Sequence, residues 1–221
     1  LNVWKDEIPA EVFTESFTPP ITDGSGNDRK NLLKAKEILE KEGWFVENGK
    51  LVKDGKEFKF EFLIVSPSDE IISLDYKINL KKLGITMDVR TVDSSQYQER
   101  LLSYDFDMIK RYWGVSLSPG NEQQFYWGSE VGQKDGSRNY PGINSPAVDA
   151  LIEKLISATN REELTTAIHA LDRVLLWGHY VVPLYHSNKD RIAYWDFFEY
   201  PDEIPLYGIV IESWWINKDK Q

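Results

Sequence analysis

Residues 57–65 read EFKFEFLIV, and this stretch decides the fold. Its apolar side chains alternate at Phe58, Phe60, Phe62 and Ile64, and its end is fully apolar. Alternation is typical of a strand with one buried face, and a continuous apolar run is typical of a strand buried on both faces. We therefore predict a strand that enters a buried sheet.

Further strands and helices are predicted to follow in alternation. The chain should continue with a helix from Ser66-Pro67 to Leu83, a strand over residues 85–92, a helix capped by Ser94 or Ser95, and a strand over residues 106–113. Strands joined by helices of this length are normally parallel, with right-handed crossovers. We expect an α/β fold with a mixed, mostly parallel sheet flanked by helices.

The outer parts of the chain give additional elements. We predict a helix from Asp28 to Gly43, a hairpin around residues 50–53, helices starting at Ser145-Pro146 and at Asn160, and strands or hinge segments at 180–185 and 191–195. The first 28 residues are irregular. The last 25 residues are apolar without a clear period, which suits a segment that packs on another part of a protein.

Composition excludes several classes of protein. The 221 residues include 26 Lys and Arg against 36 Asp and Glu, a net charge of −10, whereas nucleic-acid binders normally carry a basic face. Cysteine is absent, which excludes disulfides, thiolate metal sites and cysteine nucleophiles. No stretch approaches the roughly 20 apolar residues of a membrane-spanning helix. The chain begins with Leu1 rather than Met, which predicts a mature form or a fragment.

Signals for catalysis and for cofactors are weak. The three histidines, His169, His179 and His186, lack the spacing of metal ligands. We predict a surface position for His169. Nucleotide-binding and nucleophile motifs are also missing from the sequence. We therefore predict no metal, no cofactor and no catalytic residue.

A polar loop over residues 114–143 is the strongest candidate for binding. It follows the third predicted strand, and in open α/β sheets ligands collect at the carboxyl ends of the strands. Four aromatic residues argue against disorder in the loop: Phe125, Tyr126, Trp127 and Tyr140. Glu122 could pair with a peptide amine, and Arg138 could hold a carboxylate. The alternative is that such polar groups only tie the loop together.

Two other functional classes remain open at this point. Glu122, Glu130 and Asp135 could supply the carboxyl pair of a carbohydrate hydrolase, although acidic residues in polar loops are usually just solvated. An interaction module with an aromatic patch is the third possibility.

Several long stretches of the chain follow one another in a characteristic order. They are KAKEILEKEGW at 34–44, LKKLGITMDV at 80–89 with Tyr97 and Phe106-Asp107 after it, and NSPAVDALI at 144–152 with Val182-Pro183 later. In this order they resemble the C-terminal half of oligopeptide-binding proteins that serve ABC importers, solute-binding protein family 5. The stretches SPGNEQ at 118–123, GSRNYPGI at 136–143 and ALDRVLLWGHYVVP at 170–183 resemble the YejA-type subgroup. The resemblance covers essentially the whole chain.

This resemblance implies one lobe of a bilobal, periplasmic-binding-protein-like type II fold, with segments that cross the hinge. Residues 29–186 would form the second, peptide-binding lobe. Residues 1–28 would be a hinge and first-lobe segment, and residues 187–221 a return segment that packs on the first lobe. The implied partners are an oligopeptide or modified peptide, the N-terminal lobe of the same protein and an inner-membrane ABC permease. The implied location is the periplasm, with no enzymatic step and no nucleic acid.

The resemblance also implies roles for individual residues. The family binds an extended peptide largely through backbone hydrogen bonds, a form of strand addition. Tyr112, Trp113 and Gly114 match the segment that lies against the peptide, and Tyr97 matches an aromatic pocket. Typical members have an aspartate three residues after the tryptophan, where this chain has Ser116. Glu122 is then the candidate partner of a peptide amine, and a blocked amino terminus would also fit the missing aspartate.

The complete set of predicted ligand-binding residues combines the loop with the resemblance. It comprises Tyr97, Arg111, Tyr112, Trp113, Gly114, Ser116, Asn121, Glu122, Gln123, Arg138 and Asn139.

Aromatic residues make up 13% of the chain and are expected to serve two purposes. Flat rings can fill a core, or they can line a groove with large contact area at low entropy cost. We assign Phe58, Phe60, Phe62 and Trp177 to the core and Tyr97, Tyr112 and Trp113 to a groove. Trp195, Trp214 and Trp215 are expected to face a partner lobe.

Overall fold

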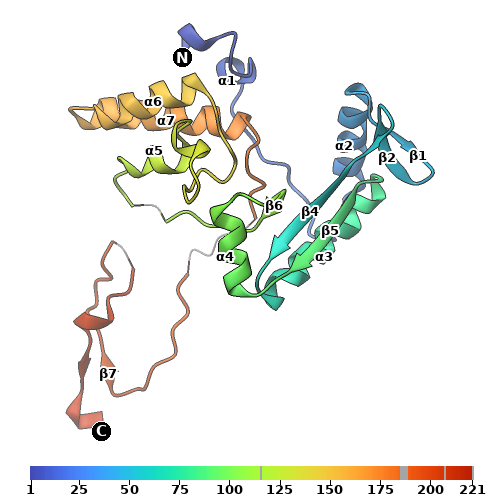
Figure 1. Ribbon diagram of the computed structural model, residues 1–221. Helices are drawn as coiled ribbons and strands as arrows, with labels where there is room; N and C mark the ends of the chain where they lie inside the picture. The colour runs from blue at the N-terminus through green and yellow to red at the C-terminus, as the bar shows by residue number, and fades with distance from the viewer. Residues whose placement is uncertain (115, 185–188, 207, 221) are drawn as a thin grey trace. The chain divides into compact units, whose positions relative to one another are not determined.

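The computed structural model describes residues 1–114, 116–184, 189–206 and 208–220 (Figure 1). The chain divides into two compact units, Leu1–Val181 and Val182–Gln221. The second unit begins before residue 187, where we placed the start of the return segment. Among the described residues, no helix combines the length and the apolar character that a membrane span requires.

A parallel sheet forms the centre of the first unit. Strand β4 (Lys59–Ile64) lies between β5 (Thr86–Thr91) and β6 (Met108–Ile109), and both neighbours run parallel to it. Phe62 is paired with Val89 on one side and with Met108 on the other. Helix α3 (Pro67–Lys82) connects β4 to β5, and α4 (Ser94–Leu102) connects β5 to β6. The predicted β-α-β-α-β order and the α/β fold class are confirmed.

The two faces of β4 pack against different helices, as the alternating side chains of a strand require. Leu63 is fully buried and belongs to a cluster with Tyr97 and Leu101 of α4. Phe62 and Ile64 are buried on the other side, with Met87 and with Tyr76 and Leu80 of α3. Because β4 is covered on both faces, its sequence becomes fully apolar toward its end.

Strand β6 is shorter than the predicted strand over residues 106–113. Only Met108 and Ile109 pair with β4. One Asp107 Oδ atom accepts a hydrogen bond from the Glu61 backbone N–H at 2.8 Å. If β6 began earlier, a backbone carbonyl of β6 would accept this bond instead. A side chain thus replaces the start of the strand, and residues 110–114 leave the sheet.

Polar side chains cap the N-termini of helices α3 and α4. Ser66 caps α3 as predicted, accepting a hydrogen bond from the Ser68 N–H. Helix α4 is capped by Asp93 rather than by Ser94 or Ser95, because its carboxylate accepts from the N–H groups of Ser95 and Gln96, both at 2.9 Å. A carboxylate at this position is also favoured by the positive end of the helix dipole.

A small antiparallel sheet precedes β4. Strands β1 (Phe45–Glu47), β2 (Lys50–Lys53) and β3 (Lys56–Glu57) follow helix α2 (Arg29–Lys41), which Asp28 caps as predicted. The turn residues Asn48-Gly49 and Asp54-Gly55 all have positive φ, which confirms the predicted hairpin. Gly84 anchors this sheet: its carbonyl accepts from the Leu51 N–H at 2.7 Å, and a Cβ on Gly84 would lie only 2.8 Å from that nitrogen.

Helices α6 (Pro146–Ile156) and α7 (Arg161–Trp177) pack on each other and form a separate core with Ile8 and Val12. Val12 belongs to the short helix α1 (Glu11–Thr14), which follows a 3-10 helix at Asn2–Trp4. The Arg173 guanidinium donates to the backbone carbonyls of Glu11, Val12 and Glu15. The first residues, which we assigned to a hinge segment, therefore contact α7 as far as Glu15.

The loop over residues 114–143 is more regular than predicted. It contains helix α5 (Glu122–Trp127) and a 3-10 helix at Val131–Gln133. Helix α5 has only six residues. Its buried Tyr126 is bonded to Gly114 at the start of the loop, and its buried Gln123 is bonded to Trp127 of the same helix.

The described residues 180–184 and 191–195, which we predicted as strands or hinge segments, form no strand. Pro183 has no N–H to donate to a ladder, and Val181 and Val182 are exposed; Tyr185 lies outside the described residues. In the second unit, β7 (Phe198–Glu199) pairs antiparallel with β8 (Trp215–Ile216), and 3-10 helices span Ile211–Ser213 and Lys218–Lys220.

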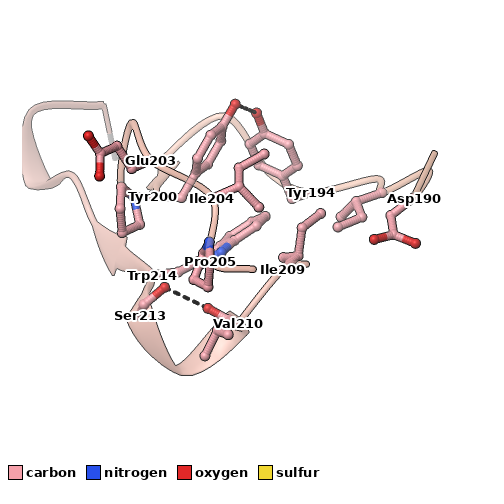
Figure 2. A pocket seen from close by; sticks show the side chains of 12 residues that line it. Asp190, Tyr194, Tyr200, Glu203, Ile204, Pro205, Ile209, Val210, Ser213 and Trp214 are labelled. Atoms are coloured by element: carbon pink, nitrogen blue, oxygen red, sulfur yellow. Dashed lines mark hydrogen bonds between the residues drawn. The ribbon is translucent and has the colours of Figure 1, made fainter. Parts of the chain in front are cut away.

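Aromatic side chains of the second unit line a pocket of about 220 Å³ (Figure 2). The Trp214 ring lies 5.0 Å from the Tyr194 ring and 5.1 Å from the Tyr200 ring, and the two tyrosine hydroxyls are hydrogen-bonded at 3.4 Å. Outside this pocket, Trp195 is 73% exposed and Leu206 is 85% exposed. The unit therefore leaves much of its apolar surface uncovered.

We expect Leu63→Ala to reduce the free energy of unfolding by about 2–5 kcal/mol, because it opens a cavity in the central strand. Urea denaturation would measure this change. Ile71→Ala, on the exposed side of α3, is the matched control, with an expected change below about 0.5 kcal/mol. Equal effects of the two substitutions would contradict the placement of Leu63 in the core.

Candidate functional site

The chain leaves the sheet at the carboxyl end of β6. The side chains of Lys110 and Arg111, which follow β6, contact opposite faces of the sheet. The Lys110 ammonium is paired with the carboxylate of Asp69, near the start of α3. Arg111 contacts Tyr140 instead, in the cluster that also includes α4 residues. The next residue, Tyr112, is 82% exposed. This exit brings residues 111–114 beside the loop that we predicted to bind a ligand.

Three rings form an aromatic cluster at this exit: Trp113, Trp127 of α5 and Tyr140. The Trp113 ring lies 5.0 Å from the Trp127 ring and 6.5 Å from the Tyr140 ring. The Trp113 indole N–H points to the Arg138 carbonyl at 3.4 Å, and the Trp127 indole N–H donates to the Gln123 side-chain oxygen at 3.0 Å. The cluster therefore joins the strand exit to both halves of the loop.

Helix α5 is tied to the strand exit on its other side. The Tyr126 hydroxyl donates to the Gly114 carbonyl at 3.0 Å. The Arg138 guanidinium lies 5.6 Å from the centre of the Phe125 ring and is exposed. Asn121, the residue before α5, is exposed and makes no side-chain capping bond, so its amide is available to a ligand.

Glu122 is an ionised acceptor that the loop backbone holds in place. Burial acts to raise the pKa of its carboxyl, but hydrogen bonds from the N–H groups of Gly120 and Glu122 and from the Gln123 amide outweigh burial. The pKa of Glu122 therefore lies below its ordinary value. The carboxylate is suited to binding an ammonium group.

The same electrostatics bear on the carbohydrate-hydrolase alternative. A glycosidase needs one carboxyl group with a raised pKa as general acid. The hydrogen bond from Lys134 lowers the pKa of Glu130, and Glu122 is also shifted downward. Neither Glu122 nor Glu130 therefore fits the role of general acid.

Two predicted ligand residues are occupied within the loop. Asn139 is fully buried: its Nδ2 donates to the carbonyls of Gly128 and Ile143, at 3.0 and 2.8 Å, and its Oδ1 accepts from the Ile143 N–H at 2.9 Å. Gln123 is buried and bonded to Trp127 and Glu122. For these two residues the alternative interpretation fits, in which polar groups tie the loop together.

Tyr97 is also placed beneath the site and not on its surface. Its ring is buried in the cluster around Leu63, and its hydroxyl donates to the Lys110 carbonyl at 3.2 Å. Burial raises the pKa of the Tyr97 phenol, and the charge of Arg111 partly opposes this shift. Ser116 is exposed and closes a local turn, donating to the Ser118 carbonyl at 2.7 Å and accepting from the Ser118 N–H.

The predicted set omits Phe125, Trp127 and Tyr140, which the structure brings to the site. The signal for them was present, because aromatic residues in a polar loop need partners. His169 is exposed on α7, as predicted, and His186 lies outside the described residues. In the described part of the chain, no group of three or more His, Cys, Asp and Glu side chains could hold a metal ion.

The site combines a parallel sheet with an ordered, aromatic loop at the carboxyl edge, which is where open α/β sheets generally bind ligands. The chain matches the family model of bacterial extracellular solute-binding proteins, family 5 (middle), over residues 5–135. This chain belongs to that family, as the sequence motifs predicted.

Individual relatives agree with this assignment. An uncharacterized protein, y4wM, of Sinorhizobium fredii is 49% identical over 218 residues, which cover 97% of this chain and 33% of the relative. The probable peptide-binding protein YejA of Agrobacterium fabrum is 42% identical over 99% of this chain and 36% of its own length. This likeness confirms the predicted subgroup. The chain therefore spans about a third of the length of these relatives.

Solved structures confirm the fold. The oligopeptide-binding protein AppA of Bacillus subtilis, in complex with a nonapeptide, matches with a TM-score of 0.61 at 24% identity. The match covers 79% of this chain and 35% of AppA.

We expect the main effect of Asn139→Ala to be a less stable loop over residues 128–143, and not the loss of a contact with a ligand. The substitution leaves buried backbone groups of Gly128 and Ile143 without partners, at about 1–3 kcal/mol for each group. Hydrogen exchange of the Ile143 amide should become faster. Asn144→Ala, at an exposed neighbouring position, is the control and should leave this exchange unchanged. Unchanged protection in Asn139→Ala would contradict the structural role.

Proposed function

We propose that this chain is the C-terminal part of a periplasmic substrate-binding subunit of an ABC peptide importer. The complete protein captures oligopeptides or modified peptides between two lobes and has no enzymatic step. The name of the A. fabrum relative, a probable peptide-binding protein, supports a peptide as the ligand.

The backbone of the strand exit is the observation that carries the proposal. Tyr112, Trp113 and Gly114 donate no backbone hydrogen bond to another described residue. They follow β6 where the chain leaves the sheet, next to the aromatic cluster. A peptide in extended conformation can pair with such free groups by strand addition, which gives affinity with little dependence on side chains.

The surrounding side chains supply specificity in this proposal. Tyr112 and Trp113 pack against peptide side chains, Glu122 takes an ammonium group, and Arg138 takes a carboxylate. Ser116 and Asn121 offer neutral hydrogen-bonding groups at the open side of the loop. Tyr97, Gln123 and Asn139 act indirectly, because they hold the strand exit and the loop in place from beneath.

The two-lobe arrangement is also a proposal. Residues 29–186 form the second lobe, and residues 1–28 and 187–221 cross the hinge toward a first lobe. The length of the relatives supports this, since they have room for a whole further lobe. The exposed Trp195, Leu206 and Ile211 support it as well, because a small unit seldom leaves so many large apolar side chains in water. Peptide binding would favour the closed form of the two lobes, which an inner-membrane permease recognises.

The complete binding protein, purified without denaturation, should release peptides that are detectable by intact-mass spectrometry. We expect Trp113→Ala to weaken peptide retention by about tenfold or more, because the aromatic cluster loses its ring at the strand exit. Phe45→Ala, an exposed aromatic residue of β1, is the matched control and should retain peptides normally. Release of sugars or of no organic ligand from the unaltered protein would overturn the proposal.

Docking on a first lobe makes a separate prediction about Leu206. If this side chain is covered in the complete protein, Leu206→Ala should lower the free energy of unfolding by about 2–4 kcal/mol, as a core substitution does. Ile71→Ala again serves as the exposed control. A change in Leu206→Ala as small as that in the control would show that the segment does not pack on another lobe.

A further inference from the structure

Arg111 is a half-buried cation that has no carboxylate partner among the described residues. Its Nη2 donates to the Tyr140 hydroxyl at 3.2 Å, and its guanidinium carbon lies 5.1 Å from the centre of the Tyr140 ring. Its Nε is buried and has no hydrogen-bond acceptor in the described part of the chain. No ion pair among the described residues includes Arg111.

Two neighbouring cations, Arg100 of α4 and Lys110 after β6, do have carboxylate partners. Lys110 is paired with Asp69, and Arg100 is paired with both Glu61 and Asp105. A neutral phenol and an aromatic ring hold a guanidinium in position, but they do not neutralise its charge. Leaving a partly buried charge unpaired is costly, so such a group usually has a counter-ion. For Arg111 the described part of the chain supplies none.

The location of Arg111 indicates where the counter-ion comes from. It is the second residue after β6 and immediately precedes residues 112–114, whose backbone N–H groups have no acceptor among the described residues. Its partner Tyr140 belongs to the aromatic cluster. Because the chain carries a net charge of −10, an unpaired arginine here does not reflect a general excess of basic residues.

We propose that Arg111 is an anion subsite of the ligand site and binds a carboxylate of the peptide. A guanidinium offers five donors in a planar fork, which matches a carboxylate with two parallel hydrogen bonds. Tyr140 is a positioning residue that orients the fork. The inference rests on the proposed function and adds to it a class of ligand: peptides that present a carboxylate, at the C-terminus or on an Asp or Glu side chain.

Peptide libraries with matched charges test the subsite on the complete binding protein. Random pentapeptides without Asp or Glu are offered as an equimolar mixture of C-terminal acids and C-terminal amides. A second mixture contains amidated peptides with one Glu or with one Gln. Mass spectrometry of the retained peptides gives an acid-to-amide ratio and a Glu-to-Gln ratio.

We expect at least one of the two ratios to be about tenfold or more in the unaltered protein, in the range of a charged hydrogen bond. The acid-to-amide ratio reports a C-terminal carboxylate, and the Glu-to-Gln ratio reports a side chain. In Arg111→Gln the raised ratio should fall severalfold, to the level that the exposed Arg138 alone supports. Ratios near one in the unaltered protein, or an unchanged ratio in Arg111→Gln, would overturn the subsite while leaving peptide binding intact. Retention of no peptide from either mixture would overturn the proposed function itself.

Two further variants keep the test decisive if Arg111→Gln folds poorly. Arg111→Lys keeps the positive charge without the planar fork, so its ratio should be reduced but remain above one. Arg161→Gln, which removes an exposed arginine at the start of α7, should keep the ratio of the unaltered protein. An Arg111→Lys ratio equal to that of the unaltered protein would show that no fork-to-carboxylate contact is made.

Discussion

The burial of β4 on both faces is the constraint on which the rest of the first unit depends. Leu63 packs toward α4, and Phe62 and Ile64 pack toward α3, so both connections of the β-α-β-α-β unit are fixed by one strand. Parallel pairing on both sides then brings the ends of β5 and β6 to the same edge of the sheet. The candidate site lies where the chain leaves that edge.

The site itself combines a free backbone with a well-anchored loop. Residues 112–114 have unused donors, whereas the loop that faces them is anchored by the buried amide of Asn139 and by Tyr126. Pre-organisation of this kind lowers the entropy that binding must overcome. Charged groups of both signs, Glu122 and Arg138, lie on the loop and suit a ligand that carries both an amine and a carboxylate.

Much of the fold could be predicted from local patterns. The periodicity of residues 57–65, the cap at Ser66 and the turns around residues 48–55 identify elements whose signals lie within a few neighbouring residues. The extent of β6 could not be predicted, because it depends on a hydrogen bond between Asp107 and the distant Glu61. The role of Asn139 was missed for the same reason, since amide side chains in a polar loop look alike until their partners are known. Arg111 entered the predicted set by position, and only the structure shows that its Nε is buried without an acceptor among the described residues.

Hydrogen exchange of the complete binding protein, with and without its co-purified peptides, tests the central claim most directly. Peptide pairing with the strand exit should slow the exchange of the amides of residues 112–114 and of the loop residues 120–127. The amides of α6 and α7 should change their exchange much less, because their core touches the site only through Trp127 of the aromatic cluster. Protection confined to α6 and α7, or none at residues 112–114, would contradict the placement of the peptide at the carboxyl edge of the sheet.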